Sequence, residues 1–158
     1  MKELLISKYS PKIITDLPFS NDFNDLLYNI IKNDLLNIVL VNNDIYTKHI
    51  ILNIIINQVN VKKEDILFLS KIKDHGITNL RVELKNFSKI PSLTNNKKFL
   101  ILDELHLYNE SIQRTIINYI DKFSHNFNTI ITTNNYHALD EMLVSRFFKI
   151  TLPKFDNL

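Results

Sequence analysis

Residues 98–104 read Lys-Phe-Leu-Ile-Leu-Asp-Glu, an apolar run that ends in two acids. Four consecutive apolar residues predict a strand that is buried on both faces, because a strand with one solvated face alternates apolar and polar residues. Strands of this kind belong to parallel sheets whose two faces are covered by helices. The two acids would stand at the carboxyl end of the strand, where open α/β sheets hold their ligands. This stretch therefore predicts an α/β fold with a site at one edge of the sheet.

The sequence on either side of this strand alternates short apolar runs with segments of helical periodicity. Further strands are expected at residues 38–41, 66–69, 129–133 and 147–152, and helices across residues 23–31, 47–58, 77–90 and 112–123. Ser20 or Asn21 can cap the first of these helices. The alternation predicts a five-stranded, mainly parallel sheet between two layers of helices.

Length and composition set limits on the class of protein. A chain of 158 residues with 45% hydrophobic content is expected to form one domain. It has no cysteine, which excludes a disulfide framework and a thiolate metal site. The longest apolar stretch, around residues 50–56, is too short to cross a bilayer, so no membrane partner is expected. We expect an intracellular protein, in the cytoplasm, the nucleus or a viral replication site.

Asp103 and Glu104 have the arrangement of a Walker B motif. In that motif the first acid holds Mg²⁺, and the second orients or deprotonates the water that attacks a phosphoryl group. The alternative is a pair of solvated acids after a buried strand. Lys48 favours the first interpretation, because it follows the strand at 38–41 and begins a helix, where a P-loop lysine reaches the phosphates.

The segment before that helix departs from a P-loop. Residues 42–49 read Asn-Asn-Asp-Ile-Tyr-Thr-Lys-His, without the glycines that let backbone amides approach phosphates. His49 stands where a Ser or Thr hydroxyl would ligate Mg²⁺, and Asp44 adds a negative charge near the expected phosphates. The sequence allows ATP and Mg²⁺ to bind through Lys48 and Asp103, but it does not favour hydrolysis.

Several segments resemble the small subunits of replication factor C and the related phage clamp-loader ATPases of the AAA+ class. Lys8-Tyr9-Ser10-Pro11 is similar to the family's Lys-Tyr-Arg-Pro element near the adenine. Residues 103–134 follow the family without a gap, and Ser145-Arg146 resembles its Ser-Arg-Cys motif. The resemblance implies a three-layer αβα AAA+ core, related to RecA-like P-loop NTPases, over residues 1–158. It also implies that the helical lid and the collar of the family are absent from this sequence.

The resemblance assigns roles to matching residues. Asn134 matches sensor 1, which senses the γ-phosphate, and Arg146 matches an arginine finger that enters a neighbouring subunit's ATP site. Tyr9 and Pro11 would lie near the adenine. The basic stripe on the helix at 77–90 would face primer-template DNA and comprises Arg81, Lys85 and Lys89. Ordinary surface or capping positions remain the alternative for these residues.

The resulting expectation is a clamp-loader-like subunit in DNA replication. It would bind ATP weakly or not at all at its own site and would contribute Arg146 in trans. Its expected partners are other clamp-loader subunits, a sliding clamp and primer-template DNA. A non-enzymatic scaffold that binds clamp, loader or polymerase is the alternative, and a DExH helicase fragment, suggested by residues 103–106, ranks third.

Overall fold

The computed structural model describes residues 11–70, 77–92 and 97–153 and contains one five-stranded sheet. The strand order is β2-β3-β4-β1-β5, and every neighbouring pair is parallel. The strands are β1 (Ile38–Val41), β2 (Ile66–Ser70), β3 (Lys98–Asp103), β4 (Phe127–Thr133) and β5 (Phe148–Thr151). All five expected strands are therefore confirmed, and the sheet is parallel throughout.

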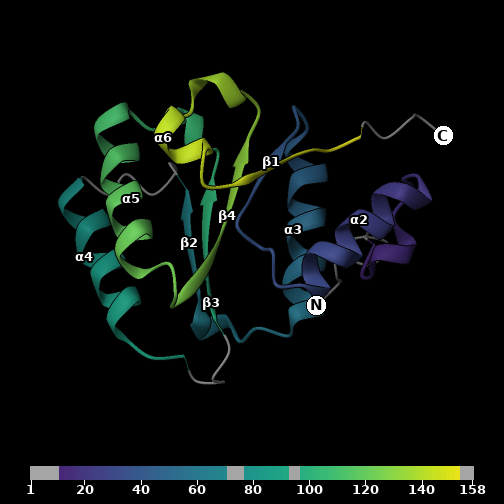
Figure 1. The fold of residues 1–158 in the computed structure, drawn as a ribbon, viewed down its shortest axis with the longest axis horizontal. Helices are drawn as coiled ribbons and strands as arrows, with labels where there is room; N and C mark the ends of the chain where they lie inside the picture. The colour runs from purple at the N-terminus through teal and green to yellow at the C-terminus, as the bar shows by residue number, and fades with distance from the viewer. Residues whose placement is uncertain (1–10, 71–76, 93–96, 154–158) are drawn as a thin grey trace, which may run out of the picture.

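Helices cover both faces of this sheet, with α2 and α3 on one side and α4 and α5 on the other (Figure 1). The α-helices are α2 (Asn21–Lys32), α3 (Ile45–Val59), α4 (Ile77–Lys89), α5 (Glu110–Phe123) and the short α6 (Glu141–Val144). The 3-10 turns are η1 (Ile14–Asp16), η2 (Lys63–Asp65), η3 (Leu105–Leu107) and η4 (Tyr136–Ala138). This arrangement is the three-layer αβα fold that the sequence predicts. No helix within the described ranges is both long and apolar enough to span a membrane.

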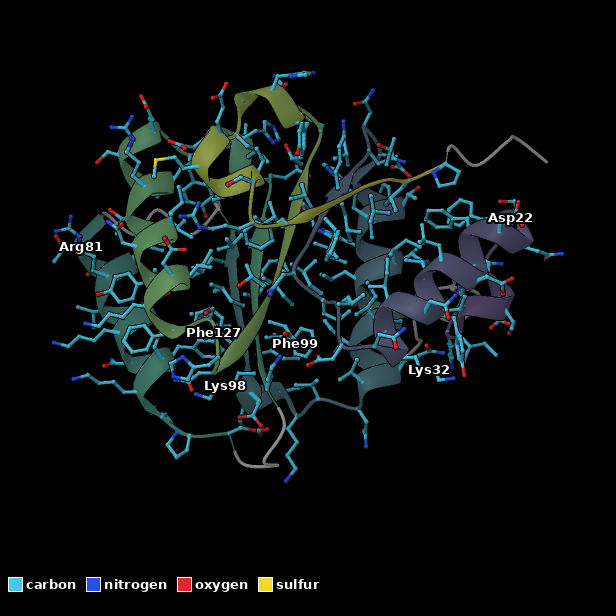
Figure 2. The ribbon with its side chains drawn as sticks, viewed as in Figure 1. Asp22, Lys32, Arg81, Lys98, Phe99 and Phe127 are labelled. Carbon is cyan, nitrogen blue, oxygen red and sulfur yellow. The ribbon has the colours of Figure 1, made fainter. Side chains whose placement is uncertain are left out.

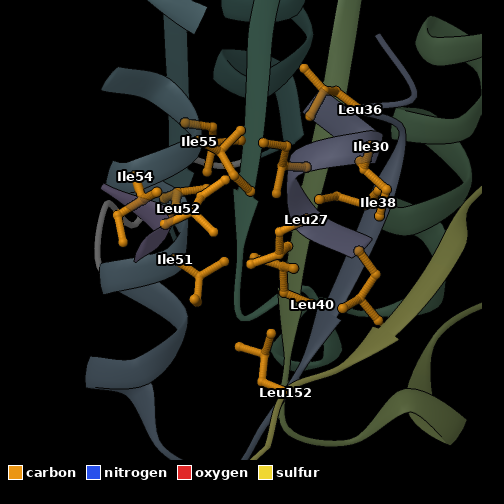
Figure 3. Close-up of a cluster of buried hydrophobic side chains, with 14 of the residues drawn as sticks. Leu27, Ile30, Leu36, Ile38, Leu40, Ile51, Leu52, Ile54, Ile55 and Leu152 are labelled. Carbon is orange, nitrogen blue, oxygen red and sulfur yellow. The ribbon is translucent and has the colours of Figure 1, made fainter. Parts of the chain in front are cut away.

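Each face of the sheet has its own hydrophobic core. On the α2 and α3 side, Leu27, Leu40 and Ile51 belong to one buried cluster (Figure 3). On the other side, Leu84 from α4 and Ile116 from α5 pack against the sheet in a second cluster. Central strands have apolar residues on both faces because both faces are covered, which explains the uninterrupted runs in the sequence.

The helix boundaries follow local capping. Ser20 accepts a hydrogen bond from the Phe23 amide and caps α2, as expected. The expected start of α3 at residue 47 is wrong by two residues. The helix begins at Ile45 because the Asp44 carboxylate accepts hydrogen bonds from the amides of Tyr46 and Thr47.

The strand order brings distant segments to one edge of the sheet. Because β4 lies between β1 and β3, the carboxyl ends of these three strands are adjacent. Val41 pairs with Thr133, and Leu102, just before Asp103, pairs with Ile131. Residues 42–49, 103–104 and 134 therefore meet at the edge where open α/β sheets hold ligands.

Candidate functional site

Asp103 ends β3 with its carboxylate almost buried. Its Oδ1 accepts a hydrogen bond from the Thr132 hydroxyl at 2.7 Å, and His49 Nε2 lies 3.2 Å from the same oxygen. Burial, the largest single influence, raises the pKa of Asp103, but the hydrogen bonds and positive charges of its neighbours outweigh burial, so the pKa lies below its ordinary value. The hydrogen bond to Asp103 is the main reason that the pKa of His49 is raised. The two side chains therefore form an ion pair whenever His49 is protonated.

Glu104 forms a second ion pair, with Lys48 from α3. The Lys48 side chain is 0% exposed and that of Glu104 is 13% exposed. Glu104 also has a left-handed backbone, with φ 49° and ψ 49°, which costs about 1–3 kcal/mol for a residue other than glycine. Its amide donates to the Thr132 hydroxyl at 2.9 Å, and His106 Nδ1 lies 3.5 Å from its carboxylate. These contacts hold Glu104 toward Lys48.

The amino terminus of α3 is occupied by a carboxylate of the same chain. Asp44 accepts from the Tyr46 amide at 3.2 Å and from the Thr47 amide at 3.0 Å, and the Thr47 hydroxyl also donates to it. The hydrogen bond from the Thr47 side chain is the largest influence that lowers the pKa of Asp44. Free amides at a helix amino terminus are a common anion site, because they combine donors with the positive end of the helix dipole. In this chain the Asp44 carboxylate already takes that position.

These three interactions decide whether the site fits Mg²⁺ and ATP. Phosphates at the start of α3 would meet the carboxylate of Asp44, and Lys48 is buried against Glu104. Asp103, the expected metal ligand, is hydrogen-bonded to His49. An imidazole is not the hard oxygen ligand that Mg²⁺ prefers. The residues present therefore do not fit Mg²⁺-ATP, because Lys48, Asp103 and the amino terminus of α3 are each paired with another side chain of the chain.

The structure places the other predicted residues as follows. Asn134 is exposed at the carboxyl end of β4, on the same edge as Asp103. Arg146 follows α6, and its Nε and Nη2 lie 2.6 and 2.8 Å from the two carboxylate oxygens of Asp121. Pro11 is partly buried at the start of the described chain, and Tyr9 lies outside the described residues.

The basic stripe of α4 is exposed along the helix. Arg81, Lys85 and Lys89 are all exposed, while Leu84 and Phe87 of the same helix are buried. The spacing of four residues thus places the three cations on the solvent side of α4, as the sequence predicts. Figure 2 shows Arg81 on the outer side of this helix.

Two sets of contacts at the site were not visible in the sequence. Thr132 contacts both Asp103 and Glu104 from the neighbouring strand β4, and Asp121 pairs with Arg146 across 25 residues of sequence. Sequence reasoning missed both contacts, because strand order and helix placement decide them. The cap at Asp44 had a detectable signal, since an acid directly before an apolar helical segment marks a helix start.

Replacing His49 by glutamine is expected to destabilise the protein in a pH-dependent way. The raised pKa of His49 means that its contribution to stability is fully present below about pH 6.5 and is lost as the pH rises through the folded-state pKa. The lowered pKa of Asp103 means that the contribution of the carboxylate is lost only below about pH 4. Near pH 5.5, the free energy of unfolding of the wild type should therefore exceed that of His49→Gln. The difference should be less than about 1 kcal/mol, because 40% of the His49 side chain is exposed.

Urea unfolding of both proteins at pH 5.5 and pH 8.5 measures this difference. The charged groups that face His49 are Asp103, Lys48 and Glu104, of which the lysine opposes its protonation. His137→Gln, at an exposed position, is the matched control. A difference that increases with pH would contradict the ion pair.

A family model described as the ATPase family associated with various cellular activities (AAA) matches residues 48–154. No curated protein is significantly similar in sequence. Among solved structures, RuvB from Thermotoga maritima has a TM-score of 0.69 at 17% identity and is matched over 90% of this chain and 48% of its own. A DNA polymerase III gamma subunit-related protein from the same organism has a TM-score of 0.67 at 17% identity, over 84% of this chain and 46% of its own.

Cdc6p from Pyrobaculum aerophilum is similar over 92% of this chain and 49% of its own, with a TM-score of 0.60 at 13% identity. The chain spans about half the length of these three structures. At these identities the likeness shows the fold, which the three structures share with this chain.

Proposed function

The chain belongs to the AAA family of ATPases, and from this premise we propose that it is a clamp-loader-like subunit of DNA replication that binds ATP weakly or not at all at its own site. Domains of this family use nucleotide and Mg²⁺ in general. In this family, the end of the sheet that holds Lys48 and Asp103 would bind the nucleotide, so the changes at these positions bear directly on ATP binding.

The observation that carries this proposal is that the residues expected to bind nucleotide are already paired with other side chains of the chain. Lys48 pairs with Glu104, His49 pairs with Asp103, and Asp44 caps α3. A nucleotide would have to break all three interactions, and separating Lys48 from Glu104 is the costliest of them because Lys48 is fully buried. A subunit built in this way keeps the AAA fold while it gives up nucleotide turnover.

A role in replication is supported by the neighbours in fold. One similar solved structure is named a DNA polymerase III gamma subunit-related protein. The exposed cations of α4, Arg81, Lys85 and Lys89, suit contact with the phosphate backbone of primer-template DNA. Other loader subunits and a sliding clamp are the proposed protein partners.

Arg146 is the proposed contribution to a neighbour's ATP site. Its side chain is about one-third exposed, and its partner Asp121 is nearly half exposed. Exposed ion pairs contribute at most about 1 kcal/mol, so Arg146 can leave Asp121 for a phosphate at low cost. A guanidinium keeps its charge and binds phosphate oxygens in a bidentate manner, as stabilisation of a transition state requires.

The purified chain is expected to give no saturable heat with Mg²⁺-ATP in calorimetry and no phosphate release above background. Asp44→Gly with Glu104→Gln frees the amides of α3 and the Lys48 ammonium, and is expected to raise ATP affinity. Binding by the wild-type chain, with turnover that Glu104→Gln abolishes, would show that the site is a working ATPase.

Arg146→Ala is expected to lower phosphate release by at least about tenfold in a complex with catalytically active AAA partner subunits, because an arginine finger stabilises transition-state charge. Lys32→Ala, which removes an exposed cation of α2, is the control and should have little effect. Assembly is followed in parallel by size-exclusion chromatography, so that lost assembly is not taken for lost catalysis.

A scaffold without any nucleotide role is the second candidate. It is favoured by the internal contacts of Arg146, which donates to the Met142 carbonyl as well as to Asp121. Undiminished phosphate release in the assembled Arg146→Ala complex would rule out the arginine-finger role and favour the scaffold.

A further inference from the structure

A pocket of about 370 Å³ lies at the edge of the sheet opposite to Asp103. It forms where α4 ends, β3 begins and the chain enters β4. Its lining includes Lys89, Lys97, Lys98 and His125, and none of its nine lining residues is acidic. The volume is within the range of small-molecule sites, and the lining itself carries positive charge and no acid.

Lys98 is the unusual residue of this pocket. It is the first residue of β3, and only 3% of it is exposed. Its ammonium donates to the Phe87 carbonyl at 2.6 Å and lies 4.5 Å from the centroid of the Phe87 ring. Figure 2 shows its position beside Phe127 at this end of the sheet. Burial lowers the pKa of Lys98, and the charge of Asp65 raises it to a smaller extent.

The hydrogen bonding of this ammonium leaves room for a ligand. An ammonium has three donors, and lysine is rarely buried unless it is paired. Within the described ranges, no carboxylate forms an ion pair with Lys98, and the hydrogen bond to Phe87 uses one donor. The acid that influences it, Asp65, accepts a hydrogen bond from Ser92. Among the described residues, the other two donors of this buried cation have no hydrogen-bond acceptor, and they can bind an anion.

The surroundings of Lys98 can adapt to such an anion. Lys97 pairs with Asp34 at 2.8 Å, but both side chains are exposed, so the pair is easily exchanged. Lys89 is exposed at the end of α4, and His125 is also exposed. The carbonyls at the end of α4 would repel an anion, but Lys98 covers the Phe87 carbonyl and the Asn126 side chain donates to the Ser88 carbonyl at 3.4 Å.

We infer that this pocket binds a phosphate group, with Lys98 as the buried anchor and Lys89 and Lys97 as outer cations. The inference does not rest on the proposed loss of nucleotide binding, since Lys48, Glu104, His49, Asp103 and Asp44 take no part, but it shares Lys89 with the proposed DNA contact of α4. The phosphate can belong to a small phosphorylated compound or to the end of a nucleic acid strand. Lys89 is common to the pocket and to the stripe of α4, so a strand bound along α4 could place its terminal phosphate here.

Pyrophosphate is the first probe, titrated into the ¹⁵N-labelled protein at low ionic strength. The amides of residues 88–90, 92, 97–98 and 125–126 are expected to shift, and those of residues 44–49 are not. Lys98→Met should weaken binding by at least about tenfold, because it removes a charged hydrogen bond. The matched control is Lys32→Met, which removes an exposed lysine on the opposite face of the sheet.

A second variant keeps the test decisive if Lys98→Met does not fold. Lys89→Gln with Lys97→Gln changes only exposed side chains and should weaken pyrophosphate binding several-fold. Shifts confined to residues 44–49, unchanged affinity in the double variant, or no saturable shift in the wild type would each overturn the inference.

The source of the phosphate is tested with two short DNA strands of one sequence, with and without a 5′-phosphate. Tighter binding of the phosphorylated strand, lost in the double variant, would identify a strand end. Equal binding of both strands, together with pyrophosphate binding that depends on the lysines, would identify a small phosphorylated compound.

Discussion

Lys48→Met is expected to lower the free energy of unfolding by about 3 kcal/mol. Removing one partner of a buried ion pair leaves the other charge uncompensated, which costs about 3–5 kcal/mol. Lys48 is fully buried and contacts Glu104. The lower end of the range applies because 13% of the Glu104 side chain still reaches solvent. Urea unfolding at neutral pH measures the loss.

A second substitution separates charge from packing. Lys48→Met combined with Glu104→Gln removes both charges, so it should recover a large part of the lost stability. Lys32→Met, which truncates an exposed lysine, should change stability by less than about 0.5 kcal/mol. If Lys48→Met lowered the free energy of unfolding by less than about 1 kcal/mol, Lys48 would not be a structural residue. Phosphate binding would then be the better explanation of its position.

Gln113→Met is expected to cost about 2–4 kcal/mol of unfolding free energy. Gln113 is 3% exposed, and its amide nitrogen donates to the carbonyls of Tyr108 and Ala138 at 3.0 and 3.2 Å. Its side-chain oxygen accepts from the Asp140 amide at 2.9 Å. Methionine fills the same space but satisfies none of these three backbone groups, and each unsatisfied buried group costs about 1–3 kcal/mol.

The same variant should loosen the segment before Arg146. Asp140 caps α6, whose amides precede Arg146 in the chain. Hydrogen exchange of the α6 amides should therefore accelerate in Gln113→Met more than that of the α2 amides. Gln58→Met, at an exposed position of α3, is the matched control. Unchanged exchange in α6 would contradict a coupling between Gln113 and the arginine.

The pattern of apolar residues was sufficient to predict the α/β fold class. Residues 99–102 and 38–41 are uninterrupted apolar runs, and both are central strands covered on two faces. The helical faces at α2 and α5 were visible for the same reason, since a period of three to four residues follows from helix geometry. Boundaries were less certain where a side chain caps the helix, as at Asp44 of α3.

The candidate site was only partly visible in the sequence. Asp103, Glu104 and Lys48 were identified by their positions after strands, and these three residues do meet at one edge. Which of these residues pair was not visible, because Glu104 is 56 residues from Lys48 and Asp103 is 54 residues from His49. No local pattern encodes pairs at that separation.

The sequence by itself determined which segments form strands and helices, because alternation and helical periodicity record which side of each element is buried. It also determined that the P-loop glycines are missing. Only the tertiary structure decided that the remaining polar residues satisfy one another. That outcome depends on the order β3-β4-β1, which brings the ends of three separate strands within hydrogen-bonding distance and buries Lys48 beside Glu104.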